Sequence, residues 1–192
     1  ARIYGFVLLL LVLAAIELLF RFTVGIGWIR IQHQPTTNHP RKGKFLGDIN
    51  PYFGVWHRSN AVTSVDTPAG KVVYASNAYG MRDCPRELRS QAPQRVVVLG
   101  DSFVEGCMVD TTNRATDILE RETGIEFLNF GTSGDFGSIQ EWMLYQHLAL
   151  QFDHSQVFIF LLPANDFRNN DLAQNPPERY RPYLRENRDA YE

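Results

Sequence analysis

Apolar residues dominate the chain from Ile3 to Phe20, where Glu17 is the only charged residue. Eighteen helical residues rise about 27 Å, close to the roughly 30 Å hydrocarbon core of a bilayer. A core helix of a globular protein would have a polar face, and this run has none. A signal peptide is the alternative, but no small-x-small cleavage site follows the run. The pattern therefore predicts a helix that anchors the chain in a lipid bilayer.

Polar and basic residues dominate the next stretch, and Glu17 and Arg21 at the end of the run are spaced for an ion pair near the membrane surface. Residues 22–50 mix Gly, Pro, Asn and Thr with basic residues, which is typical of a linker, and Trp28 is expected at the membrane interface. The predicted organisation is a transmembrane anchor at 1–21, a juxtamembrane linker at 22–50 and an α/β domain at 51–192.

Short β-like segments follow between residues 52 and 79. Residues 62–65 and 71–74 flank Asp66-Thr67-Pro68-Ala69-Gly70, whose Pro and Gly mark the turn of a hairpin. His57 lies in the same region, and we expect it to be a surface residue of a strand.

Strand and helix patterns alternate regularly from Arg95 onward. Apolar runs predict strands at 95–99, 126–130 and 156–162, and amphipathic stretches predict helices at about 114–123 and 138–151. Gly124 is expected to end the first helix, and Ser138 and Glu141 have the spacing of a capping box for the second. Strands that alternate with helices of this length pair in parallel through right-handed crossovers, so the fold class is α/β.

Polar segments follow each of the three predicted strands. Because the carboxyl ends of parallel strands lie at one edge of a sheet, Gly100-Asp101-Ser102, Gly131–Asp135 and Asn165-Asp166 are expected to converge there. An acyl-transfer site needs a nucleophile, a base and hydrogen-bond donors for the oxyanion. Ser102 can be the nucleophile. Its own N–H, the N–H of Gly134 and the side-chain amide of Asn165 can be the donors.

A base for Ser102 is harder to find. The chain has five histidines: His33, His39, His57, His147 and His154. His147 falls within a predicted helix, and His154 precedes the third strand, which places it at the opposite edge, more than about 10 Å from the serine. His57 could reach the serine only if its hairpin folded over the edge of the sheet.

Composition narrows the remaining classes of function. The 192 residues carry a net charge of −2 without an evident basic face, so nucleic acid is not an expected partner. Cys84 and Cys107 flank the serine strand, and one disulfide or two free thiols are both consistent with that placement. Gly131-x-x-Gly134 lacks the glycine pattern of a dinucleotide site, and we predict neither a cofactor nor a metal.

The three polar blocks together resemble the SGNH (GDSL-type) hydrolase family. Gly100-Asp101-Ser102 matches its first block, Asn129–Asp135 resembles the second, and Asn165-Asp166 resembles the third. Asn77–Arg82 and Glu17–Arg21 also resemble segments of membrane-anchored members. The resemblance implies a flavodoxin-like three-layer α/β/α sandwich, present here in part, with Ser102 as nucleophile and Gly134 and Asn165 as oxyanion donors.

The family resemblance also implies a function and a location. Its members are esterases, lipases and carbohydrate O-deacetylases, so an acyl or acetyl ester is the implied substrate. Members with this layout usually face the periplasm or the cell exterior. The basic residues after the apolar run favour the cytoplasm by a simple count, but large domains translocate largely regardless of charge.

One family feature is missing from this sequence: the histidine base in an Asp-x-x-His block near the C-terminus. Three expectations therefore remain open: a piece of a longer enzyme, an inactive relative that serves as a structural subunit of a membrane complex, or an unrecognised base. A sheet that ended with strand 156–162 would also have an exposed edge. Further chain, the tail 175–192 or a partner protein is expected to cover it.

Overall fold

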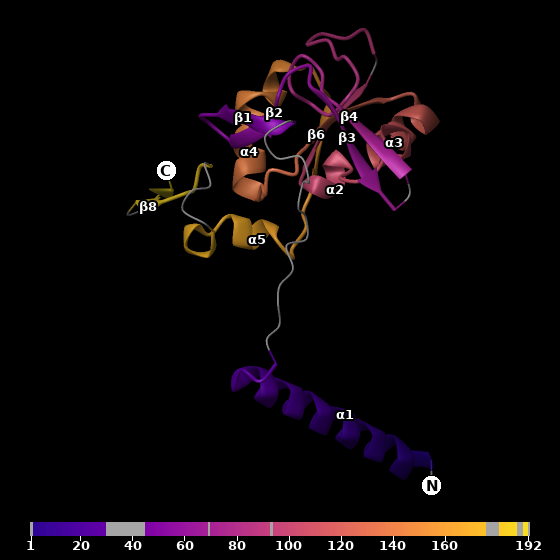
Figure 1. The fold of residues 1–192 in the computed structure, drawn as a ribbon, viewed down its shortest axis with the longest axis vertical. Helices are drawn as coiled ribbons and strands as arrows, with labels where there is room; N and C mark the ends of the chain where they lie inside the picture. The colour runs from indigo at the N-terminus through magenta and orange to yellow at the C-terminus, as the bar shows by residue number, and fades with distance from the viewer. Residues whose placement is uncertain are drawn as a thin grey trace. The chain divides into compact units, whose positions relative to one another are not determined.

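The protein divides into two compact units, Ala1–Pro35 and Thr36–Glu192. The computed structural model describes residues 2–29, 45–68, 70–92, 94–175, 181–187 and 190–191. The first unit contains helix α1 (Arg2–Gly25), and the second contains the strands and the remaining helices (Figure 1). The predicted boundaries at 21/22 and 50/51 stay predictions.

Helix α1 is apolar around its whole circumference. The stretch Tyr4–Gly25 is long and apolar enough to cross a membrane, and none of its most apolar window is buried within the protein. Arg21 Nε donates to Glu17 Oε1 at 2.7 Å, which confirms the expected ion pair. A fully exposed apolar helix of this length is consistent with a single-pass anchor. The side of the membrane on which the second unit lies stays a prediction.

Two antiparallel hairpins precede the main sheet: β1 (Leu46–Asn50) with β2 (Gly54–His57), and β3 (Val62–Thr67) with β4 (Gly70–Ala75). The second is the hairpin that the Pro and Gly of its turn predict. Its inward residues Val65, Val72 and Tyr74 pack with Phe45, which precedes β1, in a small core of their own.

The main sheet has three parallel strands in the order β6-β5-β7: β5 (Arg95–Gly100), β6 (Glu126–Gly131) and β7 (Gln156–Phe160). This confirms the parallel sheet expected from the alternating pattern. Strand β7 ends two residues before the predicted limit because the chain turns there. The N–H groups of Asn165 and Asp166 donate to the carbonyl of Leu162 at 3.1 and 3.0 Å.

Short helices connect the strands: α2 (Ser102–Glu105), α3 (Ala115–Thr123), α4 (Ser138–His147) and α5 (Asp166–Asn169). Short 3-10 turns occur at Thr111–Asn113, Ala149–Gln151 and Leu172–Gln174, and β8 (Glu186–Asn187) pairs with β9 (Ala190–Tyr191). Gly124 ends α3 in the left-handed conformation, with φ of 70°, as predicted.

The capping box predicted for α4 is wrong by one residue. Gly137 is the N-cap, and its N–H donates to the side chain of Gln140 at 2.8 Å. The Cβ of any other residue at 137 would lie 2.4 Å from the carbonyl oxygen of Asp166, so glycine permits α4 to begin this close to α5. Glu141, expected to cap the helix, points instead into the protein.

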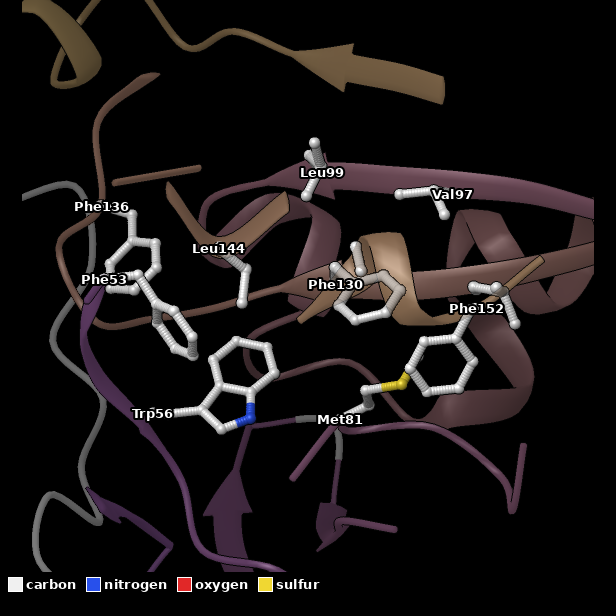
Figure 2. Packing of buried hydrophobic residues seen from close by; sticks show 11 residues of the cluster. Phe53, Trp56, Met81, Val97, Leu99, Phe130, Phe136, Leu144 and Phe152 are labelled. Atoms are coloured by element: carbon white, nitrogen blue, oxygen red, sulfur yellow. The ribbon is translucent and has the colours of Figure 1, made fainter. Parts of the chain in front are cut away.

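The sheet buries side chains on both faces. On one face, Val97 and Leu99 pack with residues of β6, α4 and the segment that follows it, and Figure 2 shows this cluster extending to Phe53, Trp56 and Met81. On the other face, Val96 and Val98 pack with Phe127 of β6, Val104 of α2 and Ile125, which directly precedes β6. The structure is thus a mixed α/β fold around one parallel sheet, with the carboxyl ends of its strands at a common edge.

Candidate functional site

Ser102 begins α2 immediately after β5, at the carboxyl edge of the sheet. Asp101 caps the helix, because its Oδ1 accepts a hydrogen bond from the N–H of Phe103 at 2.9 Å. Ser102 itself is 1% exposed, and its Oγ has no hydrogen-bond partner among the residues that the structure describes. A buried hydroxyl without a partner is unusual, because its desolvation is uncompensated.

Asn165 lies beside this turn. Its Nδ2 donates to Asp101 Oδ2 at 3.3 Å, a contact between residues 64 positions apart in the sequence. Asn165 is 3% exposed, and its Oδ1 has no partner within the described part of the chain. The first and third predicted blocks are therefore brought together as the parallel topology requires.

The loop after β6 also reaches the end of β5. The N–H of Thr132 donates to the carbonyl of Gly100 at 3.2 Å. A Cβ at Gly131 would lie 2.1 Å from the backbone N of Glu105, so only glycine allows α2 to approach β6 this closely. Gly134, however, already donates its N–H to Thr132 Oγ1 at 3.2 Å within the same turn. The predicted second donor is thus held by its own loop.

Glu141 also lies near this edge, although its sequence spacing predicts a capping residue of α4. It is 0% exposed, and neither carboxyl oxygen has a partner among the described residues. Burial, followed by the negative charges of Asp166 and Asp101, raises the pKa of Glu141 to about 8. The sequence contained a signal for this position, since Glu141 precedes the buried Leu144 by one helical turn and shares its face.

Asp166 and Asp101 share this acidic environment. Burial raises the pKa of Asp166 to about 6, although the Leu162 N–H, which donates to Asp166 Oδ2 at 2.6 Å, opposes the shift. Burial also raises the pKa of Asp101. The carboxyl edge thus holds three carboxyl groups close enough to repel one another, and at neutral pH Glu141 keeps its proton.

His57 is fully buried, which corrects the expectation of a surface residue. The hairpin β1–β2 packs against the main core through Phe53 and Trp56, so its second strand faces inward. His57 Nδ1 lies 2.8 Å from the carbonyl oxygen of Gly80, and Nε2 lies 3.5 Å from Glu105 Oε1. Since a carbonyl only accepts, Nδ1 carries a proton.

The histidine thus belongs to a buried polar network rather than to the serine. Glu105 also accepts a hydrogen bond from the hydroxyl of Ser133, and the Arg82 guanidinium donates to the carbonyls of Glu105, Gly106 and Val109. The contacts made by Glu105 and by the Glu105 carbonyl tie α2 to Ser133, His57 and Arg82. The network therefore positions the helix that begins with Ser102.

The other described histidines lie where the sequence predicts. His154 precedes β7, at the end of the sheet opposite Ser102, and contacts Tyr145 Oη at 3.1 Å and the Phe152 carbonyl at 2.7 Å. His147 is the last residue of α4 and stacks on Tyr52. His33 and His39 lie outside the described residues.

The remaining chemistry-bearing groups form no second site at this edge. Cys84 and Cys107 are both free thiols. Within the described ranges, no group of three or more His, Cys, Asp or Glu residues is arranged to hold a metal ion. A pocket of about 430 Å³ is lined by residues 75–79 and 83–87 together with Asn60, none of which belongs to the carboxyl edge.

In comparisons with known proteins, no protein-family model and no curated protein sequence matches the chain. The candidate site is therefore defined by its own residues. They are a buried serine at a strand-to-helix turn, an asparagine amide beside it, and carboxyl groups of raised pKa. Such an arrangement suits acyl transfer, provided that a base and a path for the substrate exist.

Proposed function

We propose that the protein is an SGNH (GDSL-type) hydrolase-like protein, anchored in a membrane by α1, whose Ser102 acts on acyl or acetyl esters. The observation that carries the proposal is the hydrogen bond from Asn165 to Asp101, directly beside Ser102. It joins two of the three family-like blocks across 64 residues of sequence. In this proposal the parallel sheet is the middle layer of a flavodoxin-like α/β/α sandwich on the periplasmic or exterior side of the membrane.

The proposed chemistry is a two-step acyl transfer. Ser102 Oγ attacks the ester carbonyl carbon while a base takes the hydroxyl proton, and the alcohol leaves after it has been protonated. Water then attacks the acyl-serine and releases the acid. The amide of Asn165 and the backbone N–H of Ser102 or Gly134 stabilise the oxyanion. Because Ser102 is 1% exposed and the Gly134 N–H is engaged, the substrate binds only after this edge opens locally.

We expect a low rate of ester hydrolysis for this chain of 192 residues. The sequence contains no Asp-x-x-His block. The ring of His57 contacts Gly80 and Glu105, and the ring of His154 contacts Tyr145, rather than Ser102. In serine hydrolases, loss of the base leaves only about 10³–10⁴-fold catalysis over water, supplied by the oxyanion donors and by binding. We therefore expect slow acylation of Ser102 rather than efficient turnover.

Labelling with a fluorophosphonate probe tests this proposal. The full chain in detergent is incubated with the probe, and the labelled residue is located by peptide mass spectrometry. We expect slow labelling at Ser102 that Ser102→Ala abolishes. The matched control is Ser155→Ala, an exposed serine at the other end of the sheet, which should label like the wild type. No labelling of the wild type, or labelling that persists in Ser102→Ala, would reject the nucleophile.

A non-catalytic assembly subunit is the second candidate function. It is favoured by the exposed apolar residues of β7, which are 43–53% exposed at positions 158–160. A bare apolar strand on a folded domain is typical of a protein contact surface. The two candidates differ in the labelling experiment, because a subunit without catalytic function leaves Ser102 unlabelled.

A further inference from the structure

Glu105 lies one helical turn after Ser102 on α2. Ser102 and Glu105 are 1% and 0% exposed, whereas Phe103 is 68% exposed, so the serine and the glutamate share the inward face of the helix. The N–H of Glu105 donates to the carbonyl of Asp101 at 3.0 Å, and the N–H of Cys107 donates to the carbonyl of Ser102 at 2.8 Å. Because these hydrogen bonds close the turn around Ser102, a displacement of Glu105 also displaces the serine.

The Glu105 side chain also reaches the loop that follows β6. Its Oε2 accepts a hydrogen bond from the hydroxyl of Ser133, which is 1% exposed. Ser133 directly precedes Gly134, whose N–H is a proposed oxyanion donor. Asn129 Nδ2 donates to the carbonyl of Val104 at 2.7 Å, so the strand itself is also held against α2. The Glu105 carboxylate thus links the helix of the proposed nucleophile to the loop of a proposed oxyanion donor.

His57 lies on the other side of the same carboxylate. Its Nε2 is 3.5 Å from Glu105 Oε1, and its Nδ1 is 2.8 Å from the carbonyl oxygen of Gly80. The His57 ring is 0% exposed, so Glu105 is enclosed between the imidazole and the Ser133 hydroxyl. A side chain that is locked by packing and hydrogen bonds holds its neighbours more precisely than a mobile one. The surroundings of Glu105 therefore suit a residue that fixes the position of a loop.

We propose that Glu105 is a positioning residue of the acyl-transfer site, whose carboxylate fixes the Gly134 loop relative to Ser102 by way of Ser133. The inference rests on the proposed function, because it assigns a role in the reaction of Ser102. Glu105 contacts neither the substrate nor the reacting atoms. Oxyanion donors act only when they lie at hydrogen-bond distance from the position that the oxyanion will occupy. A misplacement of about 1 Å can lower a rate about 10²-fold, so the link affects the rate although it takes no part in the chemistry.

Glu126 offers a matched comparison at the amino end of the sheet. Its Oε1 accepts from Ser90 Oγ at 2.8 Å, and its Oε2 accepts from Arg95 Nε at 2.7 Å. Glu126 thus joins a serine hydroxyl to a nitrogen-bearing side chain, as Glu105 does, although 28% of its own side chain is exposed. Because it lies at the opposite end of the sheet from Ser102, Glu126→Ala should lower stability without slowing the reaction of the serine. A purely structural role for Glu105 predicts the same result for Glu105→Ala.

Labelling kinetics of the full chain in detergent test the proposal. The maximal rate of fluorophosphonate labelling at Ser102, measured at saturating probe and per folded protein, separates positioning from probe binding. We expect Glu105→Ala and Ser133→Ala each to lower this maximal rate about 10- to 100-fold. The double variant should be no slower than the slower single variant, because both substitutions break the same link. Circular dichroism and urea unfolding measure the folded fraction of each variant.

Two conservative variants make the test independent of any cavity that alanine creates. Glu105→Gln retains an oxygen that can accept from Ser133, and Ser133→Thr retains the hydroxyl that donates. Both variants should therefore label nearly as fast as the wild type.

The outcomes separate this role from the proposed function. No labelling of the wild type at Ser102 would reject the hydrolase chemistry and the positioning role together. Wild-type labelling with unchanged maximal rates in Glu105→Ala and Ser133→Ala would reject the positioning role alone. Independent losses that multiply in the double variant, or an equal loss in Glu126→Ala, would also reject it. Slower labelling of both alanine variants, without further loss in the double variant and with restoration by Glu105→Gln and Ser133→Thr, would support it.

Discussion

The two ends of the parallel sheet differ in whether their buried charged groups have partners of opposite charge. At the amino end, the guanidinium of Arg95 is 3% exposed and donates to Glu126 Oε2 at 2.7 Å, to the Asp153 carboxylate and to the carbonyls of Glu87 and Leu88. At the carboxyl end, Asp101, Glu141 and Asp166 approach one another without a cation among the contacts that shift their pKa values.

This difference distinguishes residues that stabilise the fold from residues whose burial lowers its stability. A buried polar group that lacks a partner costs about 1–3 kcal/mol, and the carboxyl end carries several such groups whereas Arg95 carries none. Natural proteins keep unsatisfied groups mainly where function requires them. We therefore expect substitution of Arg95 at the amino end to lower stability, and substitutions that remove an unpartnered polar group at the carboxyl end to raise it or leave it nearly unchanged.

Arg95→Ala should have the largest effect. Removing the buried guanidinium ends its hydrogen bonds to the carbonyls of Glu87 and Leu88 and opens a cavity, which should lower the free energy of unfolding by about 2–5 kcal/mol. Urea denaturation measures this change. The matched control is Arg121→Ala, because Arg121 and Glu122 form an exposed pair at 3.3 Å that contributes less than about 0.5 kcal/mol. Similar losses for both arginines would contradict the assigned role of the amino end.

Glu141→Gln should make the free energy of unfolding less dependent on pH. The folded pKa of about 8 lies above the usual 4.5, so the stability that Glu141 contributes is fully present below pH 4.5 and is lost as the pH rises towards 8. Over the 2.5 pH units from 4.5 to 7, the wild type should lose about 3 kcal/mol through this group. Asp166, with a folded pKa of about 6, acts in the same direction.

The measurement is urea denaturation of both proteins between pH 4.5 and 8. The Gln variant cannot ionise at position 141, so its stability should fall less steeply with pH, and the curves should diverge as the pH rises. The difference in slope is the readout, because a buried Gln amide without a partner lowers stability equally at every pH. Parallel curves would mean that Glu141 is already ionised or solvated in the folded protein.

Some features of this structure can be predicted from the sequence, whereas others depend on tertiary contacts. Strand runs and turn residues predicted the parallel sheet and the β3–β4 hairpin, because periodicity and glycine or proline chemistry act locally. Whether Glu141 is buried depends on which residue caps α4. Gly137 is the cap because only glycine permits the close approach to α5 at that position. His57 became buried because its hairpin packs on a distant core. Such tertiary contacts leave little trace in a local pattern.

Asn165→Ala should have a smaller effect on stability than on labelling. The variant loses the 3.3 Å hydrogen bond to Asp101, which should lower the free energy of unfolding by about 1–2 kcal/mol. If the amide also stabilises the oxyanion, probe labelling of Ser102 should slow by about 10²–10³-fold. Both are measured on the same preparation. A loss of stability without a change in labelling would reduce Asn165 to a structural role.

Two buried serines give the smallest and most direct test. Ser102 and Ser133 are each 1% exposed, but Ser102 Oγ has no partner among the described residues, whereas Ser133 Oγ donates to Glu105. Ser133→Ala removes a donor from a buried carboxylate and should lower the free energy of unfolding by about 1–3 kcal/mol. Ser102→Ala removes a hydroxyl that has no partner and should change stability by less than about 1 kcal/mol, in the stabilising direction. Equal losses for the two variants would show that Ser102 serves the fold, as Ser133 does, and would remove the reason to regard its unpaired hydroxyl as retained for function.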